Sequence, residues 1–371
     1  MSYYIGVMSG TSLDGIDVAI TSFSESGSNF QFVQAKTFPF PNGLHQSIKQ
    51  LITEQQSSLQ DLGELNIALG QLIGQSINTL LTEQNISPAD IKAIGSHGQT
   101  IFHSPVGDYP FSQQIGDANI IAEMTGITTV ANFRQRDIAA GGQGAPLVPA
   151  FHHALFHSND EDRVIVNIGG ISNITCLPSS SDEPILGFDT GPGNVLLDYW
   201  IQLQLEQSYD SNGQWAASGK CNNKLLSYLL DEPYFKQAIP KSTGRELFNS
   251  DWLAKKIALE LNDLSPVDIQ ATITELTALT IANDINRYAS TSNSVFICGG
   301  GAHNQHLLNR LQSLLDTKNV STTESLGLHP DWVEACAFSW LAHRTVNKQS
   351  GNLPSVTGAK RPVILGAIYP A

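Results

Sequence analysis

A strand–turn–strand pattern occurs twice in this chain, and it limits the possible folds more than any other feature. Residues 3–23 contain two apolar, β-rich runs on either side of the polar turn Ser9–Ile16, and residues 163–177 repeat the pattern around a glycine turn at 168–171. Short apolar runs joined by glycine-containing turns predict β-hairpins. A third strand and then a helix follow the second hairpin. The pattern therefore indicates two related α/β halves that face each other across a cleft.

The length of the chain agrees with two domains. A chain of 371 residues exceeds what one hydrophobic core usually serves. The charged, polar break at residues 159–162 is the predicted boundary. We therefore expect an N-terminal domain at 1–158 and a C-terminal domain at 159–349, with the tail at 350–371 as an alternative completion of the first domain.

Charge and cysteine content exclude several classes of partner. The formal net charge is −14 with no basic cluster, so nucleic acid and anionic membrane surfaces are not expected as partners. No apolar run reaches the roughly 18 residues of a membrane span, and the N-terminus enters a strand directly. The four cysteines are scattered, as is typical of small buried side chains in a reducing compartment. The sequence predicts a soluble cytoplasmic protein that acts on small molecules.

The candidate catalytic residue is Asp189. Residues 185–188 form a strand pattern that ends at this carboxylate, and a glycine-rich turn follows, with Pro192 placed for a first helical turn. A carboxylate at a rigid strand end is suited to proton abstraction, and N–H groups at a helix N-terminus are suited to a phosphate. The alternative is an Asp that caps its own turn.

The turn of the first hairpin is a candidate phosphate site. Gly10 and Gly15 have the spacing of a P-loop, but Ile16 and Asp17 stand where that motif requires Lys and Ser/Thr. Backbone N–H groups and small hydroxyls can still hold phosphates here, while Asp14 or Asp17 faces a metal ion. The alternative is an ordinary polar hairpin turn. The hydroxyl side chains are Ser9, Thr11 and Ser12.

Two further segments are candidates for substrate binding. His97 and Gln99 follow a strand pattern at 91–95, where they either bind a sugar hydroxyl or make structural hydrogen bonds. Arg134 and Arg136 occur in a segment that we expect to be an irregular, glycine-rich loop. Arginine can bind a substrate carboxylate through two hydrogen bonds, and pairing with Asp137 is the alternative.

The C-terminal half adds two candidates. Gly299–Gly301 join a strand pattern to a helix pattern, and glycine there allows the backbone to approach a flat base or a ribose. Glu334 is the one acid in a strongly apolar helix pattern, so it either lies on the exposed face or points into a site.

Seven segments, distributed in order over nearly the whole chain, resemble those of the anhydro-N-acetylmuramic acid kinases of bacterial cell-wall recycling. They are GVMSGTSLDGID from Gly6, GSHGQT from Gly95, FRQRDIAAGGQGAPLVP from Phe133, NIGGISNIT from Asn167, GFDTGPGN from Gly187, KSTGRE from Lys241 and CGGGAHN from Cys298.

This resemblance implies an α/β fold of two RNase H-like domains, of the actin, hexokinase and Hsp70 type, that flank an ATP and substrate cleft. It implies Mg²⁺ as a cofactor, Asp189 as the catalytic base and a homodimer, and it places Ser9, Asp14, His97, Gln99, Arg134, Arg136 and Glu334 at the sugar. The ATP-binding residues that it implies are Gly10, Thr11, Ser12, Leu13, Asp14, Gly15, Ile16, Asp17, Gly169, Gly170, Gly191, Gly193, Asn194, Gly299, Gly300 and Gly301.

The implied reaction opens the 1,6-anhydro ring with water, phosphorylates O6, and gives N-acetylmuramic acid 6-phosphate and ADP. Two alternatives remain at this point. One is a kinase of another hexose or hexosamine on the same fold. The other is an actin-like or chaperone-like regulatory ATPase, although the sequence has no substrate-binding appendage of that kind. Fold alone does not decide between them, because function depends on the site.

Overall fold

The computed structural model describes residues 1–10, 13–24, 29–259 and 264–371. The chain forms two compact units: unit 1 comprises Met1–Leu155 with Trp332–Ala371, and unit 2 comprises Phe156–Asp331. The division between Leu155 and Phe156 lies close to the boundary expected from the sequence. The division between Asp331 and Trp332 lies earlier than the expected end of the second domain at residue 349, so residues 332–349 belong to unit 1. The chain therefore leaves unit 1, forms unit 2, and returns to complete unit 1.

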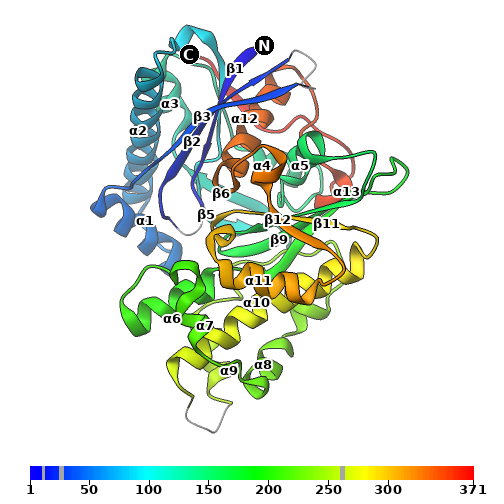
Figure 1. Cartoon of the computed structure of the whole chain (residues 1–371). Helices are drawn as coiled ribbons and strands as arrows, with labels where there is room; N and C mark the ends of the chain where they lie inside the picture. The colour runs from blue at the N-terminus through cyan, green and yellow to red at the C-terminus, as the bar shows by residue number, and fades with distance from the viewer. Residues whose placement is uncertain (11–12, 25–28, 260–263) are drawn as a thin grey trace. The chain divides into compact units, whose positions relative to one another are not determined.

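A six-stranded sheet in the order β13-β7-β4-β1-β2-β3 forms the centre of unit 1 (Figure 1). β1, β2 and β3 are successive antiparallel neighbours, whereas β4 runs parallel to β1 and β7 parallel to β4. β5 and β6 form a separate two-stranded sheet. The strands are β1 (Ser2–Met8), β2 (Ile16–Phe23), β3 (Phe30–Phe38), β4 (Ile91–Ser96), β5 (Gln99–Ser104), β6 (Phe111–Ile115), β7 (Thr129–Ala131) and β13 (Ala367–Tyr369).

The helices of unit 1 cover its sheet. Figure 1 shows α2 and α3 side by side, and their apolar residues join those of β1 and β2 in one core that includes Ile5, Leu69 and Ile121. α2 begins after Ser58, whose hydroxyl accepts the Asp61 N–H, as is typical of a serine N-cap. The helices are α1 (Asn42–Glu54), α2 (Leu59–Gln84), α3 (Ala118–Thr125), α4 (Phe133–Ala139), α5 (Pro149–Phe156), α12 (Val333–Val346) and α13 (Pro354–Thr357), with a 3₁₀ turn η1 (Pro88–Asp90).

α12 packs directly on the backbone of the sheet, which explains why it belongs to unit 1. A Cβ atom on Gly6 would collide with the Ala335 carbonyl, and one on Gly95 with the Phe338 carbonyl. Only glycine allows this approach between strand and helix. The Thr21 hydroxyl of β2 also donates a 2.8 Å hydrogen bond to Ser339 of α12. α12 is therefore part of the core of unit 1.

Unit 2 repeats the sheet topology of unit 1. Its five strands have the order β10-β9-β8-β11-β12. The first three are antiparallel neighbours, and β11 and β12 run parallel to β8. This is the arrangement of β3-β2-β1-β4-β7, so the two expected α/β halves share one topology. The strands are β8 (Arg163–Ile168), β9 (Ile171–Leu177), β10 (Leu186–Pro192), β11 (Ser294–Cys298) and β12 (Asn319–Thr322).

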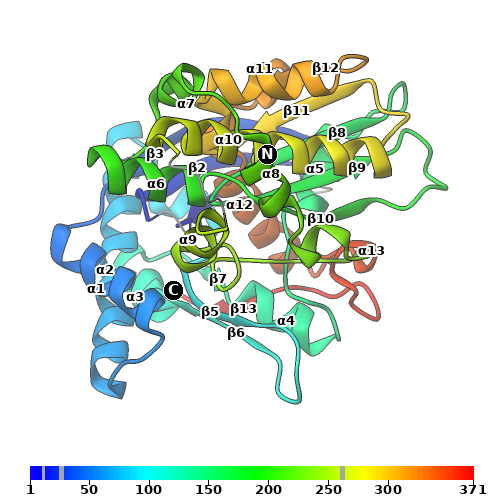
Figure 2. The same cartoon turned by 90° about the horizontal axis from the view of Figure 1, so that it is seen from below.

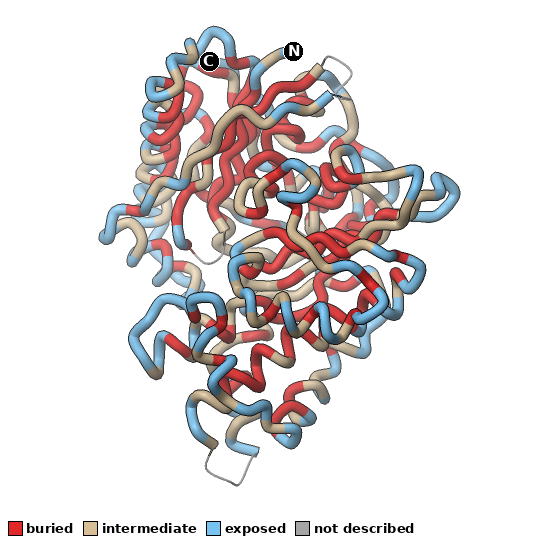
Figure 3. Tube along the Cα trace, in the orientation of Figure 1, coloured by how far each residue is buried: buried red, intermediate tan, exposed pale blue. Residues whose placement is uncertain are grey.

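The long helix α10 organises unit 2. The Ser265 side chain accepts the Asp268 N–H and caps this helix, and Pro266 occupies its first turn. Figure 2 shows α8 beside α10, and Figure 3 shows that much of α10 is buried. The helices are α6 (Val195–Leu205), α7 (Gln214–Ser218), α8 (Asn223–Leu230), α9 (Ser250–Ile257), α10 (Pro266–Tyr288) and α11 (Gln305–Leu314), with 3₁₀ turns η2 (Ser211–Gly213), η3 (Pro233–Lys236), η4 (Gly300–His303), η5 (Thr323–Leu326) and η6 (Pro330–Trp332).

Several local expectations need correction. The expected loop that carries Arg134 and Arg136 begins as the helix α4. Pro192 is the last residue of β10 rather than part of a first helical turn, and α6 begins at Val195. All four cysteines are free, but Cys221 is exposed rather than buried. In the described ranges of the chain, no helix combines the length and hydropathy required to cross a membrane.

His152 of α5 makes the stability of the protein dependent on pH. Its side chain is fully buried, and burial lowers the pKa of the imidazole to about 3. The unfolded chain, with a His pKa near 6.5, therefore binds a proton more readily than the folded chain. The contribution of neutral His152 is complete above pH 6.5 and is lost as the pH falls toward 3.

We expect the free energy of unfolding of the wild type to fall, relative to that of His152→Leu, by about 1.4 kcal/mol for each pH unit below 6.5. Urea unfolding of both proteins at pH 7, 6 and 5 measures this difference. Parallel pH dependence of the two proteins would contradict it.

Candidate active site

The candidate residues of unit 2 gather at one edge of its sheet. β8, β10 and β11 run in the same direction, so their carboxyl ends meet at that edge. Gly169 follows β8, Asp189 lies near the end of β10, and Gly299 follows β11. The carboxyl ends of strands in open α/β sheets are the usual place for ligands. The topology thus brings together residues that are 130 positions apart in sequence, from Gly169 to Gly299.

Asp189 is held from several directions. Its side chain is 9% exposed, and its Oδ2 atom accepts a 3.0 Å hydrogen bond from the Thr243 N–H. Its backbone carbonyl accepts a 2.6 Å hydrogen bond from the Tyr234 hydroxyl, and its backbone N–H donates to the Lys241 carbonyl at 3.2 Å. Fixed partners on both backbone and side chain keep a carboxylate in one orientation. This is the property that a general base requires.

The turn at Gly299–Gly301 lies against the end of β8. Gly299 has φ = +76°, and a Cβ atom there would collide with the Asn167 side chain. A Cβ atom on Gly301 would collide with the Ile168 side chain, and one on Gly300 would lie 3.6 Å from Asn194 Nδ2. The predicted adenosine turn is therefore adjacent to the Gly169–Gly170 hairpin turn and to Asn194. These glycines leave backbone, rather than side chains, at this edge.

The helix N-terminus beside Asp189 differs from the sequence-based expectation. The N–H groups of Gly193 and Val195 donate to the Gly170 carbonyl at 2.9 and 3.1 Å, and that of Asn194 donates to Gly169 at 2.8 Å. These three N–H groups are therefore engaged by the hairpin turn and are not available to a phosphate. Gly193 is required for this contact, because a Cβ atom there would collide with the Gly169 carbonyl.

Gly191 also has a packing role. Its φ is +143°, and a Cβ atom there would lie 2.7 Å from the ring of Phe235. The glycines of the Asp189 segment thus shape the turn itself.

The predicted sugar-binding residues lie in unit 1, and two of them follow strand ends. Ser9 follows β1 and His97 follows β4, and these two strands are parallel. The Ser9 hydroxyl donates a 2.6 Å hydrogen bond to Gln99 Oε1, and Arg134 Nε donates a 3.0 Å hydrogen bond to His97 Nε2. Arg134 Nη1 also donates to the Gly144 carbonyl at 2.9 Å. Four of the predicted residues therefore form two hydrogen-bonded pairs.

His97 is a neutral hydrogen-bonding group. Its Nε2 accepts from Arg134, so its Nδ1 carries the proton and donates to the Gly98 carbonyl at 2.9 Å. Burial, and then the Arg134 charge, lower the pKa of His97 well below its usual value. In this arrangement His97 orients the guanidinium of Arg134.

Asp137 lies in α4 and holds the glycine-rich segment that follows this helix. Asp137 is fully buried and accepts hydrogen bonds from Asn352, Thr357 and the Gly144 N–H at 2.7, 2.8 and 2.8 Å. These partners fold the glycine-rich segment onto the C-terminal tail. Arg136 is exposed, and Glu334 is half-buried in the first turn of α12.

The first hairpin turn is partly outside the described residues. Thr11 and Ser12 lie outside them, and Leu13 has φ = +60° with its N–H donating to Gly10 at 3.2 Å. Asp14 is exposed, and Asp17 accepts a 2.6 Å hydrogen bond from Thr37. Among the described residues, no group of three or more metal-ligating side chains occurs. Mg²⁺ usually binds one or two carboxylates together with substrate phosphates, and Asp14 and Asp17 are the two carboxylates of this turn.

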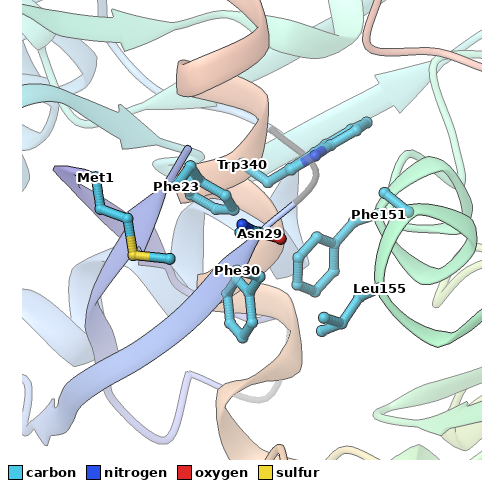
Figure 4. A pocket seen from close by; sticks show the side chains of 8 residues that line it. Met1, Phe23, Asn29, Phe30, Phe151, Leu155 and Trp340 are labelled. Atoms are coloured by element: carbon cyan, nitrogen blue, oxygen red, sulfur yellow. The ribbon is translucent and has the colours of Figure 1, made fainter. Parts of the chain in front are cut away.

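Several residues around Asp189 are not predicted from the sequence. Lys241 and Thr243 belong to the segment KSTGRE, which by itself indicates no role for either residue, and Tyr234 and Asp284 lie in no motif. A pocket of about 430 Å³ in unit 1 was also not expected; it is lined by Phe23, Phe30, Phe151 and Trp340, among others (Figure 4). The residues that line it do not include any of the predicted site residues.

The family model for anhydro-N-acetylmuramic acid kinase matches residues 2–371. Anhydro-N-acetylmuramic acid kinase of Coxiella burnetii is 52% identical over 366 residues, which cover 99% of this chain and 97% of that protein. The enzyme of the same name from Pasteurella multocida is 52% identical over 369 residues, with the same coverage.

Among solved structures, component A of (R)-2-hydroxyglutaryl-CoA dehydratase from Acidaminococcus fermentans superposes with a TM-score of 0.50 at 10% identity, covering 93% of this chain and 98% of that one. This similarity concerns the fold alone, which is the mixed α/β fold of the actin and Hsp70 type. The family match over nearly the whole chain identifies the chain as a phosphotransferase. It belongs to the anhydro-N-acetylmuramic acid kinase family.

Proposed function

We propose that this protein uses ATP to open the 1,6-anhydro ring of 1,6-anhydro-N-acetylmuramic acid with water and to phosphorylate O6. The products are N-acetylmuramic acid 6-phosphate and ADP. Family membership supports the reaction, and the observation that carries the mechanism is the fixed, nearly buried carboxylate of Asp189. A cytoplasmic homodimer is the expected form of the protein.

The chemistry requires a base because the bicyclic sugar has no free O6 hydroxyl. Asp189 takes a proton from water as the water oxygen attacks C1. The C1–O6 bond breaks, O6 attacks the γ-phosphorus, and ADP leaves with the electrons of the broken phosphoanhydride bond. The protein contributes mainly position and charge stabilisation. The hydrogen bond from the Thr243 N–H keeps Oδ2 of Asp189 fixed during this step.

We assign nucleotide binding to two sets of turns. The glycine turns at 169–170 and 299–301, which leave backbone rather than side chains at the sheet edge, are assigned to the adenosine. The first hairpin turn, Gly10–Asp17, is assigned to the phosphates. Asp14 or Asp17 would hold Mg²⁺, which supplies neutralisation of phosphate charge when bound. Gly191, Gly193 and Asn194 then act by shaping the turn, because the N–H groups of Gly193 and Asn194 are engaged elsewhere.

Arg134 is the better candidate for the lactyl carboxylate. Arg134 is half-buried and its guanidinium is oriented by His97 Nε2 and the Gly144 carbonyl, whereas Arg136 is exposed. Ser9, His97, Gln99 and Glu334 complete the proposed sugar-binding set.

We expect Arg134→Ala to raise the KM for the anhydro sugar by about 10–100-fold, since a hydrogen bond to a charged group contributes ~1.5–3 kcal/mol. The KM for ATP should not change. Steady-state kinetics with each substrate varied in turn measures both constants, and Arg136→Ala is the matched control with a smaller effect. An unchanged sugar KM in the Arg134→Ala, Arg136→Ala double variant would remove this role.

The reaction itself is tested with purified protein, Mg-ATP and 1,6-anhydro-N-acetylmuramic acid in ¹⁸O-labelled water. Mass spectrometry should show a sugar phosphate that carries one solvent oxygen, because water adds at C1. If this product is absent and ordinary hexosamines are phosphorylated without the label, the protein is a kinase of another sugar on the same fold.

A further inference from the structure

Lys241 is a buried lysine in unit 2, close to Asp189. Its residue is 4% exposed, and its Nζ atom lies 3.2 Å from Asp284 Oδ2 on α10. The same Nζ lies 5.1 Å from the ring centroid of Tyr234 and 5.5 Å from that of Phe188, within the range of cation–π attraction. A buried ion pair is costly to desolvate and is therefore weak evidence of a stabilising role. The position of Lys241 next to the groups that bind Asp189 points to a role in holding Asp189.

The partners of Lys241 are the groups that hold Asp189. Among the described residues, β10 is an edge strand of its sheet, and the Asp189 N–H donates to the Lys241 carbonyl. Two residues later, the Thr243 N–H donates to Asp189 Oδ2. Tyr234, whose ring contacts the Lys241 ammonium, donates its hydroxyl to the Asp189 carbonyl. The segment 241–243 thus forms the outer support of the base.

Burial and neighbouring charges shift the pKa values of Tyr234 and Asp284, which both contact Lys241. Burial, and then the negative charges of Asp189, Asp284 and Glu246, raise the pKa of Tyr234 far above its usual value, so its hydroxyl remains a donor. Burial raises the pKa of Asp284, and the charges of Lys241 and Arg287 oppose this effect. Lys241 is the cation that is hydrogen-bonded to Asp284 in this group.

We propose that Lys241, anchored to α10 through Asp284, is a positioning residue that holds the segment 241–243 and Tyr234 against Asp189. The inference rests on the proposed function, in which Asp189 is the base. Lys241 acts through backbone and ring contacts and does not itself react.

The test separates positioning from stability. Lys241→Met combined with Asp284→Leu replaces the ion pair by apolar side chains of similar size, a change that often preserves or raises stability. We expect the melting temperature of this double variant to be retained and the KM for ATP to be unchanged. The kcat should fall by roughly 10–100-fold, because small misplacement of a catalytic group has effects of this size.

The pH profile gives a second readout. Loss of a well-aligned Thr243 N–H bond removes an interaction that favours the charged carboxylate, so the pKa of Asp189 should rise. The acid limb of kcat/KM should therefore move to higher pH in the double variant. If kcat and the acid limb both match those of the wild type, Lys241 has no positioning role.

The ion pair between Arg310 of α11 and Glu275 of α10 provides a matched control. Arg310 Nε and Nη2 donate to Glu275 at 2.8 and 2.9 Å, and this pair joins α11 to α10 rather than to the Asp189 support. Arg310→Met combined with Glu275→Leu should leave kcat and the acid limb unchanged. If this control variant loses as much kcat as the Lys241 double variant, then removal of either ion pair on α10 lowers the rate, and the proposal is overturned.

Two further variants distinguish this inference from the proposed function. In an Asp189→Asn background, Lys241→Met should not lower the residual rate further, since groups that act as a unit are not additive. Normal turnover of Asp189→Asn alone would refute the role of the base, whereas an inactive Asp189→Asn with a normal Lys241 double variant would refute only the positioning role.

If the Lys241 variants do not fold, Tyr234→Phe provides the test: unchanged kcat would overturn the proposal, and a reduced kcat with unchanged KM would support it.

Discussion

Asp189→Asn is expected to lower kcat by ~10²–10⁴-fold, because that is the usual contribution of a positioned general base. The amide has almost the shape of the carboxylate, so the hydrogen bond from the Thr243 N–H to one side-chain oxygen and the two backbone hydrogen bonds can persist. ATP affinity should therefore stay close to that of the wild type. Single-turnover kinetics and ATP binding measured on the same preparation test both expectations.

Asp231→Asn is the control for the loss of one negative charge in unit 2. Asp231 is exposed and pairs with Lys236 at 2.9 Å on the surface. Exposed pairs of this kind contribute little to stability, so this variant should turn over like the wild type. Near-normal turnover of Asp189→Asn would remove Asp189 from the catalytic step.

Gly95→Ala is expected to destabilise unit 1 by about 3 kcal/mol or more. The added methyl group would meet the backbone carbonyl of Phe338 on α12, and backbone cannot move aside as a flexible side chain can. The whole helix must shift away from β4, which opens a gap in a closely packed core. The midpoint and slope of urea unfolding measure the change.

Gly63→Ala is the matched control for this variant. Gly63 lies on the exposed face of α2, and a Cβ atom there would have no neighbour within 4 Å. Because glycine is a poor helix former, the change should stabilise the protein by roughly 0.5–1 kcal/mol. Equal effects of the two substitutions would show that contact with α12 is not what requires glycine at position 95.

The fold was largely predictable because its signals are local. Hairpin strands with glycine turns, the Ser58 cap of α2 and the Ser265–Pro266 start of α10 all depend on residues near in sequence. The assignment of α12 to unit 1 could not be predicted, because it depends on contacts between Gly95 and Phe338, which are 243 positions apart.

In the candidate site, too, local features could be predicted from the sequence and contacts between distant residues could not. Asp189 could be recognised at the end of a strand pattern next to a glycine-rich turn. The engagement of the Asn194 N–H by Gly169 could not, because hydrogen bonds between separate turns leave no periodic pattern in sequence. Buried pairs such as Lys241 and Asp284 are invisible for the same reason: each residue alone looks like a surface charge.

The return of the chain to unit 1 has a consequence for synthesis on the ribosome. Unit 2 is one continuous segment, Phe156–Asp331, whereas the core of unit 1 needs α12, which is translated after the whole of unit 2. Domains fold as units during synthesis, and contacts between distant parts of a chain form slowly. Unit 2 can therefore fold while the β1–β4 face that receives α12 is still uncovered. During that interval the nascent protein leaves an apolar sheet face uncovered, and such transiently exposed surface is prone to aggregation.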